Sequence, residues 1–484
     1  MKNAVQSIVV AVLLLLSVSS AFPQSDDTEW DRLNQEVLSL YEQGNYDQAV
    51  SIAINALGLA EKNGGENHAY VAGSLNTLAG LYIAQGMYVQ ADPYYKRLLA
   101  IYEKNLGPDH PETIKCLFNL AELYKVQGKY ADAEPLYKRV LAIMEKELEP
   151  SHPNVAAILN NLAGLYQSQG KYAEAEKLYS RMLEIDQETL DPNDPDVANS
   201  LNNLASLYDV QGKVAEAESF YKRALAILET ASDPESPAVA VSLNNLALLY
   251  HRQGKYAQAE PLCKRALAIK EKALGPVHPS VAISLNNLAE LYSDQGRHAE
   301  AELLYKRSLA IQEKVLGPNH YILGVSLDGL AELYCIQGRY AEAEPLNKRA
   351  LAISEKALGP EHLAVARSLS GLAELARKQG NLAEVETLCK RSLAIREQAL
   401  GPNHYEVAGS LNDLAELYRL QGNYSESEPL YKRALEIREK ALGPDHPSVA
   451  VSLSGLAELN RKTGRVQEAN ALDQRAAKIR AMER

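Results

Sequence analysis

The sequence predicts an all-α protein, an α-solenoid in which about eleven helix-turn-helix repeats stack in a row. Three observations predict this fold. Eleven glycines, from Gly44 through Gly254 to Gly464, recur every 42 residues without a slip. Apolar residues on either side of each glycine fall at the three- and four-residue steps of amphipathic helices. A fixed period of this length indicates stacked repeats, each of which lacks a closed core of its own.

The stretch 239–280 shows how one repeat is built. Its first apolar stripe spans residues 239–250 and predicts a helix that ends at Gly254. A second stripe spans residues 256–274 and predicts a second helix. This helix stops at Gly275-Pro276, where glycine tolerates a left-handed backbone and proline cannot continue the helix. Each repeat is therefore expected to be an antiparallel pair of helices.

The stacking of these pairs follows from the sizes of their side chains. Ala247 and Ala259 are small among larger apolar residues, so the two helices can approach closely, and Tyr250 and Tyr256 fill the space beside them. One pair leaves its apolar face uncovered, and the first helix of the next repeat must cover it. Because the period is unbroken, we expect one continuous, elongated array.

The amino terminus predicts export. Residues 1–21 contain Lys2, an apolar run from Ile8 to Leu16, and the small residues Ser19-Ser20-Ala21, in the order typical of a signal peptide. Cleavage would place the protein in the periplasm or the medium. Residues 22–27 form a polar lead-in, and residues 28–484 form the array.

Three repeats depart from the pattern. The first repeat, which begins near Trp30, and the last, in which Asn460 replaces a tyrosine, are predicted to be caps. The repeat around Gly380 is predicted to be a looser joint, because smaller or apolar residues replace two tyrosines and an alanine there: Ala376, Leu382 and Val385.

The arrangement of Leu-Ala and Tyr before the glycine and Tyr and Ala after it resembles the tetratricopeptide repeat. The resemblance covers residues 28–484. The period exceeds the usual ~34 residues, and the long form with SLNNLA and LGPxHP is similar to the repeats of kinesin light chains and of many bacterial proteins. The resemblance implies a protein–protein interaction scaffold whose first helices line a concave groove that takes an extended peptide or a partner's helix.

Composition narrows the range of partners. The net charge is −12, and removal of residues 1–21, whose only charged side chain is Lys2, leaves −13. This balance argues against nucleic acid or an anionic membrane as the main partner. The four cysteines lie in different repeats without CxxC spacing, so buried free thiols are expected in place of disulfides, redox chemistry or metal binding.

Histidines recur in the loops, one to a repeat. Asp194 and Ser236 occupy the same position in two repeats, and both are good helix N-caps. Capping is therefore favoured over metal binding for the following histidines: His68, His110, His152, His278, His320, His362, His404 and His446. The Lys-Arg pairs of the second helices, such as Lys264-Arg265, are predicted to form a solvated, ion-paired face.

Pairs of asparagines stand in the middle of four first helices, where asparagine is a poor helix former: Asn160-Asn161, Asn202-Asn203, Asn244-Asn245 and Asn286-Asn287. The resemblance to kinesin light chains implies that such amides hold the backbone of an extended peptide. A carboxamide both donates and accepts hydrogen bonds, as that role requires. The alternative is that one member of each pair bonds to the neighbouring repeat. We expect at least one member to face the groove.

Charged residues replace the amides further along the same face: Glu290, Glu332, Glu374, Glu416 and Glu458, with Arg377, Arg419 and Arg461 one turn on. They are explained either as ion pairs three residues apart or as a charged part of the groove. The second interpretation predicts partners that bind only one half of the array.

The sequence contains no nucleophile–base pair, phosphate loop or metal motif outside the repeat pattern, so no catalytic residue, metal site or cofactor is predicted. A scaffold that binds a protein or peptide ligand is the leading hypothesis. An alternative is an assembly component of an envelope or secretion complex that uses its convex face or its ends. A cytosolic cargo adaptor like kinesin light chain would conflict with the export signal.

Overall fold

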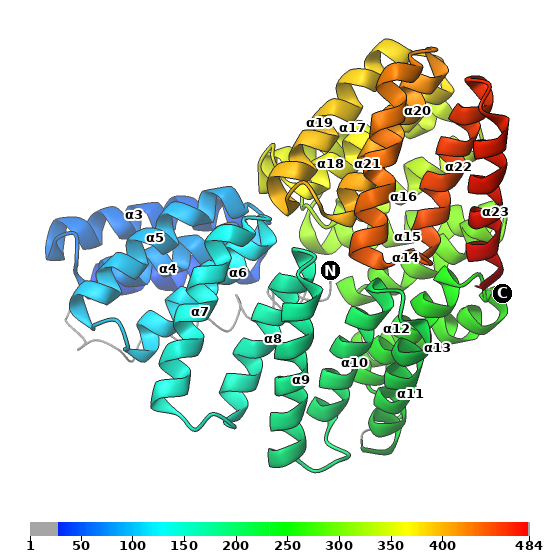
Figure 1. The fold of residues 1–484 in the computed structure, drawn as a ribbon. Helices are drawn as coiled ribbons and strands as arrows, with labels where there is room; N and C mark the ends of the chain where they lie inside the picture. Colours follow the sequence, from blue (N-terminus) through cyan, green and yellow to red (C-terminus); the bar gives the residue numbers. More distant parts are fainter. Residues whose placement is uncertain (1–27, 232, 483–484) are drawn as a thin grey trace. The chain divides into compact units, whose positions relative to one another are not determined.

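The computed structural model describes residues 28–231 and 233–482, and over these residues the chain is a succession of α-helices with no strand (Figure 1). Helices alternate between the first helix of a repeat, here helix A, and the second, helix B. The A helices are α2 (Thr28–Glu42), α4 (Ala69–Ala84), α6 (Pro111–Val126), α8 (Pro153–Ser168), α10 (Pro195–Val210), α12 (Pro237–Arg252), α14 (Pro279–Asp294), α16 (Leu323–Ile336), α18 (Leu363–Lys378), α20 (Tyr405–Leu420) and α22 (Pro447–Lys462). The B helices are α3 (Tyr46–Gly64), α5 (Tyr88–Asn105), α7 (Tyr130–Glu147), α9 (Tyr172–Thr189), α11 (Val214–Ala231), α13 (Tyr256–Leu274), α15 (His298–Leu316), α17 (Tyr340–Leu358), α19 (Leu382–Leu400), α21 (Tyr424–Leu442) and α23 (Val466–Met482).

Most A helices begin at a histidine cap, as the sequence predicts. In seven repeats the histidine Nδ1 accepts a hydrogen bond of 3.0–3.3 Å from the backbone N–H two residues on: His68, His110, His152, His278, His362, His404 and His446. Asp194 caps α10 in the same way. The prediction is wrong at two loops. α16 begins only at Leu323, beyond His320, and the Ser236 side chain makes no capping bond to α12.

Glycines end both helices of a typical repeat. Gly254 has φ +68° between α12 and α13, and Gly275 has φ +86° at the end of α13; other side chains rarely adopt this conformation. Glu149, Asp191 and Asp233 replace the second glycine after α7, α9 and α11, and these helices are 18 residues long where α13 has 19.

The core lies between helix pairs and runs from one repeat to the next. Helix A packs on its own helix B, and helix B packs on the next helix A, as in α10, α11 and α12. Ala247 and Ala259 are fully buried where α12 and α13 cross, and Tyr221 and Tyr250 belong to the same apolar cluster. The close approach predicted from the two alanines is confirmed.

The chain divides into two compact units, which the unbroken period did not predict. Unit 1 comprises residues up to Glu149 together with the segments Leu316–Tyr321 and Glu355–Pro360; unit 2 comprises the remainder from Pro150 onward. The boundary falls at the first loop in which a non-glycine residue follows helix B. The predicted signal peptide and polar lead-in, residues 1–27, lie outside the described residues.

Ion pairs cover the B helices. The lysine of each Lys-Arg pair contacts a carboxylate four residues earlier at 2.6–3.0 Å, as in Lys264–Glu260. Most of the arginines reach back to a glutamate of the preceding repeat at 2.5–2.6 Å, as in Arg265–Glu229. The predicted ion-paired face is confirmed, and each exposed pair stabilises the fold by at most about 1 kcal/mol.

Candidate functional site

Three positions on the A helices of unit 2 carry the residues that the sequence singles out. The inner position is occupied by Asn160, Asn202, Asn244, Asn286, Asp328, Ser370, Asn412 and Ser454. The outer position, one residue later, is occupied by Asn161, Asn203, Asn245, Asn287, Gly329, Gly371, Asp413 and Gly455. The carboxylate position, three residues further on, is occupied by Glu290, Glu332, Glu374, Glu416 and Glu458 from α14 onward.

Inner-position amides join neighbouring repeats. Asn244 Nδ2 donates to Ser284 Oγ of the next helix A at 2.9 Å, and Asn286 Nδ2 donates to Ser326 Oγ at 2.8 Å. Asn202 Oδ1 accepts from Ser242 Oγ at 3.2 Å. These three amides are only 4–8% exposed. The inner position therefore serves the architecture, as the alternative interpretation of the asparagine pairs proposed.

The inner position keeps this role when its residue changes. Asn412 Nδ2 donates to Ser452 Oγ at 3.2 Å. Asp328 accepts from Ser368 Oγ at 3.1 Å and from Arg367 Nε at 2.9 Å. Burial raises the pKa of Asp328, and the hydrogen bonds and charge of Arg367 only partly oppose that effect.

The outer position is more varied. Asn161 Nδ2 bonds to the Ala157 carbonyl of its own helix at 3.0 Å, and Asn203 Nδ2 donates to Asn160 Oδ1 at 2.8 Å. Asn245 is 8% exposed, and its Nδ2 has no hydrogen-bond partner. Asn287 is half-buried. That one amide of each pair faces a groove remains a prediction. It now applies to the asparagine at the outer position.

Glycines at the outer position have a packing role that sequence analysis missed. A Cβ at Gly329 would lie 2.7 Å from the Tyr305 ring, and a Cβ at Gly455 would lie 2.4 Å from the Tyr431 ring. These distances are shorter than any normal contact, so the tyrosine of the preceding helix B fills the place of an outer side chain. The replacement of asparagine by glycine at the outer position, which also occurs at Gly371, was the available signal.

Two of the predicted ion pairs at the carboxylate position are confirmed. Arg377 bonds Glu374 and Arg419 bonds Glu416, both at 2.6 Å. The third arginine, Arg461, pairs with Asp473 of α23. Burial disfavours ionisation of Glu416, but hydrogen bonds from Arg419 and Tyr431 outweigh it and lower the pKa of that carboxyl.

Glu332 lies in the opposite environment. Burial raises its pKa, and the carboxylates of Glu290, Asp294, Asp328 and Glu374 raise it further. Within the described part of the chain, neither Glu290 nor Glu332 forms an ion pair within 4.0 Å. The A helices α14, α16 and α18 thus present an acidic stretch, defined by these five residues.

Two hollows open beside the carboxylate position. One, of about 550 Å³, is lined by Glu332, Cys335, Ile336, Gln337, Gly338, Tyr340, Glu374 and Lys378. The other, of about 200 Å³, has Ala373, Val385 and Cys389 in its wall, where Cys389 occupies the position that a tyrosine fills in most repeats. The second hollow lies in the repeat predicted to be a loose joint.

The described residues contain no group of histidine, cysteine, aspartate and glutamate side chains placed to hold a metal ion. All four cysteines are free thiols. Burial raises the pKa of Cys263 and of Cys389 to about 12, so both remain protonated at neutral pH. None of the helices in the described part combines the length and apolar character that crossing a bilayer requires.

Comparisons with known proteins agree with this architecture. The tetratricopeptide repeat model matches residues 33–104, 70–146, 154–230, 238–314, 295–356, 321–398, 370–440 and 406–481. A search of curated proteins finds no match to the chain.

Similar solved structures include a kinesin light chain of Podosopora anserina with nearly identical tetratricopeptide-like repeats. It is 32% identical, covering 43% of this chain and 98% of that chain, with a TM-score of 0.36. BtubC (BKLC) from P. vanneervenii is 27% identical, covering 47% of this chain and 89% of that chain, with a TM-score of 0.38. A Rap protein complexed with Competence and Sporulation Factor is 17% identical, covering 76% and 97%, with a TM-score of 0.49. Because the tetratricopeptide repeat model matches well over half of the chain, the chain belongs to the tetratricopeptide repeat family, whose members generally serve as protein-interaction scaffolds.

Proposed function

We propose that the A helices of unit 2 bind an extended polypeptide segment of a partner protein through their outer and carboxylate positions. The observation that carries this proposal is the difference between the two asparagines of each pair in α12 and α14. Inner amides such as Asn244 and Asn286 are used by bonds between repeats, whereas Asn245 and Asn287 make no such bond in the structure. Asparagine is a poor helix former, and the bonds between repeats account for Asn244 and Asn286 but not for Asn245 and Asn287.

The chemistry of the two positions fits a polypeptide. A row of carboxamides can both donate to and accept from a peptide backbone, whatever side chains the peptide carries. The two hollows beside the carboxylate position supply space for partner side chains. Binding to an extended segment therefore explains the outer amides and the hollows together.

The acidic stretch specifies the partner further. Neither Glu290 nor Glu332 forms an ion pair in the described part of the chain, and the pKa of Glu332 is raised by burial and by the surrounding carboxylates. A lysine or arginine of a bound segment would relieve that repulsion and neutralise the stretch. We infer that the part of the partner segment that contacts α14, α16 and α18 is basic.

A matched pair of double variants tests the proposal. N245A/N287A removes two outer amides, and N244A/N286A removes the inner amides one residue away in the same two helices. Residues 22–484 of each variant serve as bait for the exported protein fraction and for an immobilised library of extended peptides with and without lysine and arginine. Weakened capture by N245A/N287A, with an unchanged unfolding midpoint, supports the proposal.

Retention of every ligand by N245A/N287A would contradict the proposal. It would favour a contact on the convex face or at the ends of the array, as expected for an assembly component. Variants at Asn202, Asn244 and Asn286 cannot serve as binding probes, because those side chains form the bonds between repeats.

We further propose that the protein is exported, on the basis of the sequence of residues 1–21. Amino-terminal sequencing of the natural protein tests this proposal. A mature chain that begins at Phe22 supports export, and a cytosolic pool that retains residues 1–21 contradicts it and revives the cargo-adaptor hypothesis.

A further inference from the structure

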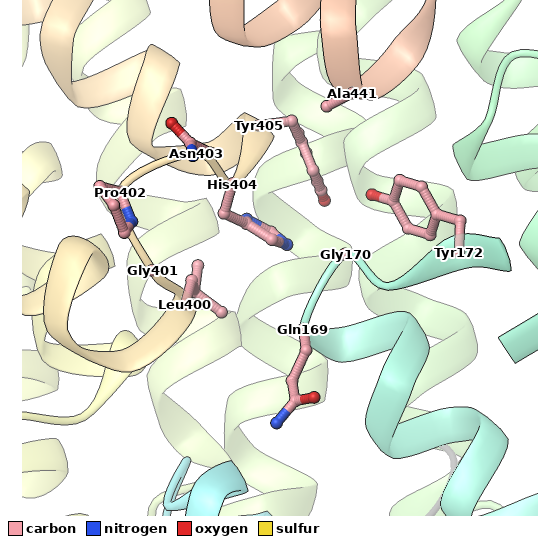
Figure 2. A pocket seen from close by; sticks show the side chains of 10 residues that line it. All are labelled: Gln169, Gly170, Tyr172, Leu400, Gly401, Pro402, Asn403, His404, Tyr405 and Ala441. Carbon is pink, nitrogen blue, oxygen red and sulfur yellow. The ribbon is translucent and has the colours of Figure 1, made fainter. Parts of the chain in front are cut away.

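Two segments of unit 2 that are far apart in the sequence meet at a buried contact. The turn Gln169–Tyr172, which leads into α9, lies against the loop Leu400–Tyr405, which leads into α20. Figure 2 shows the side chains of His404, Tyr405 and Tyr172 pointing into the space between these segments. A Cβ at Gly170 would lie 2.8 Å from Cδ2 of His404, so the turn and the loop approach closely there.

The same contact recurs at a fixed spacing. A Cβ at Gly212 would lie 2.7 Å from Cδ2 of His446, and 234 residues separate the members of each pair, as they separate Gly170 from His404. Unit 1 contains a third example at the same spacing, in which a Cβ at Gly86 would lie 2.9 Å from Cδ2 of His320. In these three pairs, the turn of one helix pair lies against a loop 234 residues further along the chain.

Departures from the repeat pattern occur at the contact. Among the loops with a histidine at this position, Tyr321 and Tyr405 are the two cases of tyrosine, and proline is the usual residue. Tyr321 packs edge-on against Tyr88 in unit 1, with ring centroids 5.2 Å apart. Tyr405 lies next to Tyr172 around the cavity in unit 2. Both tyrosines thus lie at the contact, Tyr405 at the start of α20 and Tyr321 in the loop before α16.

We propose that Gly170 with His404 and Gly212 with His446 form a latch that holds successive turns of the unit 2 array together and that opens when the imidazoles take up a proton. The latch would set how far the A helices of unit 2 can spread, and hence how open the face carrying the outer and carboxylate positions is. It does not depend on what that face binds.

The hydrogen bonding of His404 explains why a proton would open the latch. Its Nδ1 accepts from the Glu406 backbone N–H at 3.3 Å, so the neutral ring carries its hydrogen on Nε2. Nε2 and the Tyr172 hydroxyl are buried without hydrogen-bond partners. The cavity between them, of about 290 Å³, has no charged side chain in its lining. Protonation would break the capping bond and place a positive charge in that neutral cavity.

The surrounding groups do not offset this cost. Tyr172 and Tyr405 face His404 from the two segments. The Glu406 carboxylate, which acts on Tyr172, lies 3.9 Å from Arg396 Nε, and the Arg252 guanidinium of α12 acts on Tyr405. Burial lowers the pKa of His404 to about 4. Burial and the nearby Arg438 guanidinium lower the pKa of His446. Because both pKa values are lowered, the histidines stabilise the closed latch fully above about pH 6.5, and this stabilisation is lost as the pH falls toward the pKa of the closed form.

Amide hydrogen exchange of residues 22–484 tests the latch across its two sides. G170A adds a Cβ that would collide with His404, whereas G254A adds a Cβ with no atom within 4 Å. Because φ is +71° at Gly170 and +68° at Gly254, the two variants carry the same backbone strain. We expect G170A to speed exchange of residues 401–406 at least tenfold and G254A to leave it unchanged. Equal exchange in the two variants would overturn the latch.

Y405P provides a second variant in case G170A folds poorly. Proline is the residue that follows His278 and His446 in the same position, so it suits the start of α20. Y405P should speed exchange of residues 169–173, on the other segment. Unchanged exchange there would overturn the latch.

The pH dependence is tested with the wild type and H404F, which retains an aromatic ring but cannot be protonated. After correction for intrinsic rates, protection of residues 169–173 in the wild type should fall by up to about tenfold per pH unit between pH 6.5 and 4, and in H404F it should not. H278F, which loses a cap outside the contact, serves as the control. Protection that falls equally in the wild type and H404F would overturn the role of the proton.

Discussion

The two halves of the helix A row in unit 2 use one scaffold for two kinds of surface. In α8, α10, α12 and α14 the inner and outer positions are amides, and in α16, α18, α20 and α22 carboxylates, serines and glycines replace most of them. The bond between repeats survives this change, since Asn286 and Asp328 both bind a serine of the next helix A. The bond between repeats therefore constrains hydrogen bonding at the inner position and leaves the charge of the surface free to vary.

The largest effect should come from breaking that bond in the amide half. N244A/N286A removes the donors to Ser284 and Ser326 and leaves buried hydroxyls with fewer partners, at a cost of about 1–3 kcal/mol per site. We expect a total loss of about 2–6 kcal/mol, measured as a fall in the urea unfolding midpoint by circular dichroism and as faster hydrogen exchange confined to α12–α16. N245A/N287A is the control and should change the midpoint little. Equal losses in the two variants would mean that both positions are architectural.

This first comparison also shows what a sequence can predict in a repeat protein. The period, the glycine turns, the histidine caps and the alanine contact follow from local chemistry repeated eleven times, and each is confirmed at Gly254, His278 or Ala247. The contact between Gly170 and His404 depends on the sum of the small rotations that accumulate over the repeats between them. No local pattern records that sum, although Tyr405 in place of proline marked one of its consequences.

The same limit applies to the candidate site. The sequence brought Asn244 and Asn245 to attention together, because both are poor helix formers in the same helix. Only the structure separates them, because one amide lies opposite Ser284 and the other does not. Likewise the glutamates at the carboxylate position look alike in the sequence, and their neighbours in adjacent repeats decide whether each is paired or repelled.

Neutralising the glutamate at the carboxylate position should have a smaller effect on stability, and the sign should differ between Glu416 and Glu332. E416Q loses its ion pair with the nearly buried Arg419 guanidinium and should destabilise the fold by about 1–3 kcal/mol at pH 7. E332Q removes a carboxylate that other carboxylates repel and should stabilise the fold by up to about 1 kcal/mol. Paired urea titrations at low salt measure both changes.

The pH dependence of E332Q provides its control. Because the pKa of Glu332 is raised in the folded protein, wild-type stability relative to E332Q should fall as the pH rises through the ordinary glutamate range, and the two proteins should converge below about pH 4. Added salt should shrink the difference at pH 7. A stabilising effect that is independent of pH and salt would show that the gain does not come from repulsion within the acidic stretch.

The smallest effect should come from filling the hollow in the repeat around Gly380. Cys389 stands where Tyr431 stands two helices later in the array, and the Tyr431 hydroxyl bonds Glu416 at 2.8 Å. In C389Y the ring should occupy the hollow of about 200 Å³, and its hydroxyl should reach Glu374 in the same way, which would raise stability by about 1 kcal/mol. C389A, which enlarges the hollow, should lower stability by a similar amount. A loss in C389Y would mean that Asp413 and Arg377, which also line the hollow, need the space for their own solvation, and that this repeat is open for the sake of its charged surface.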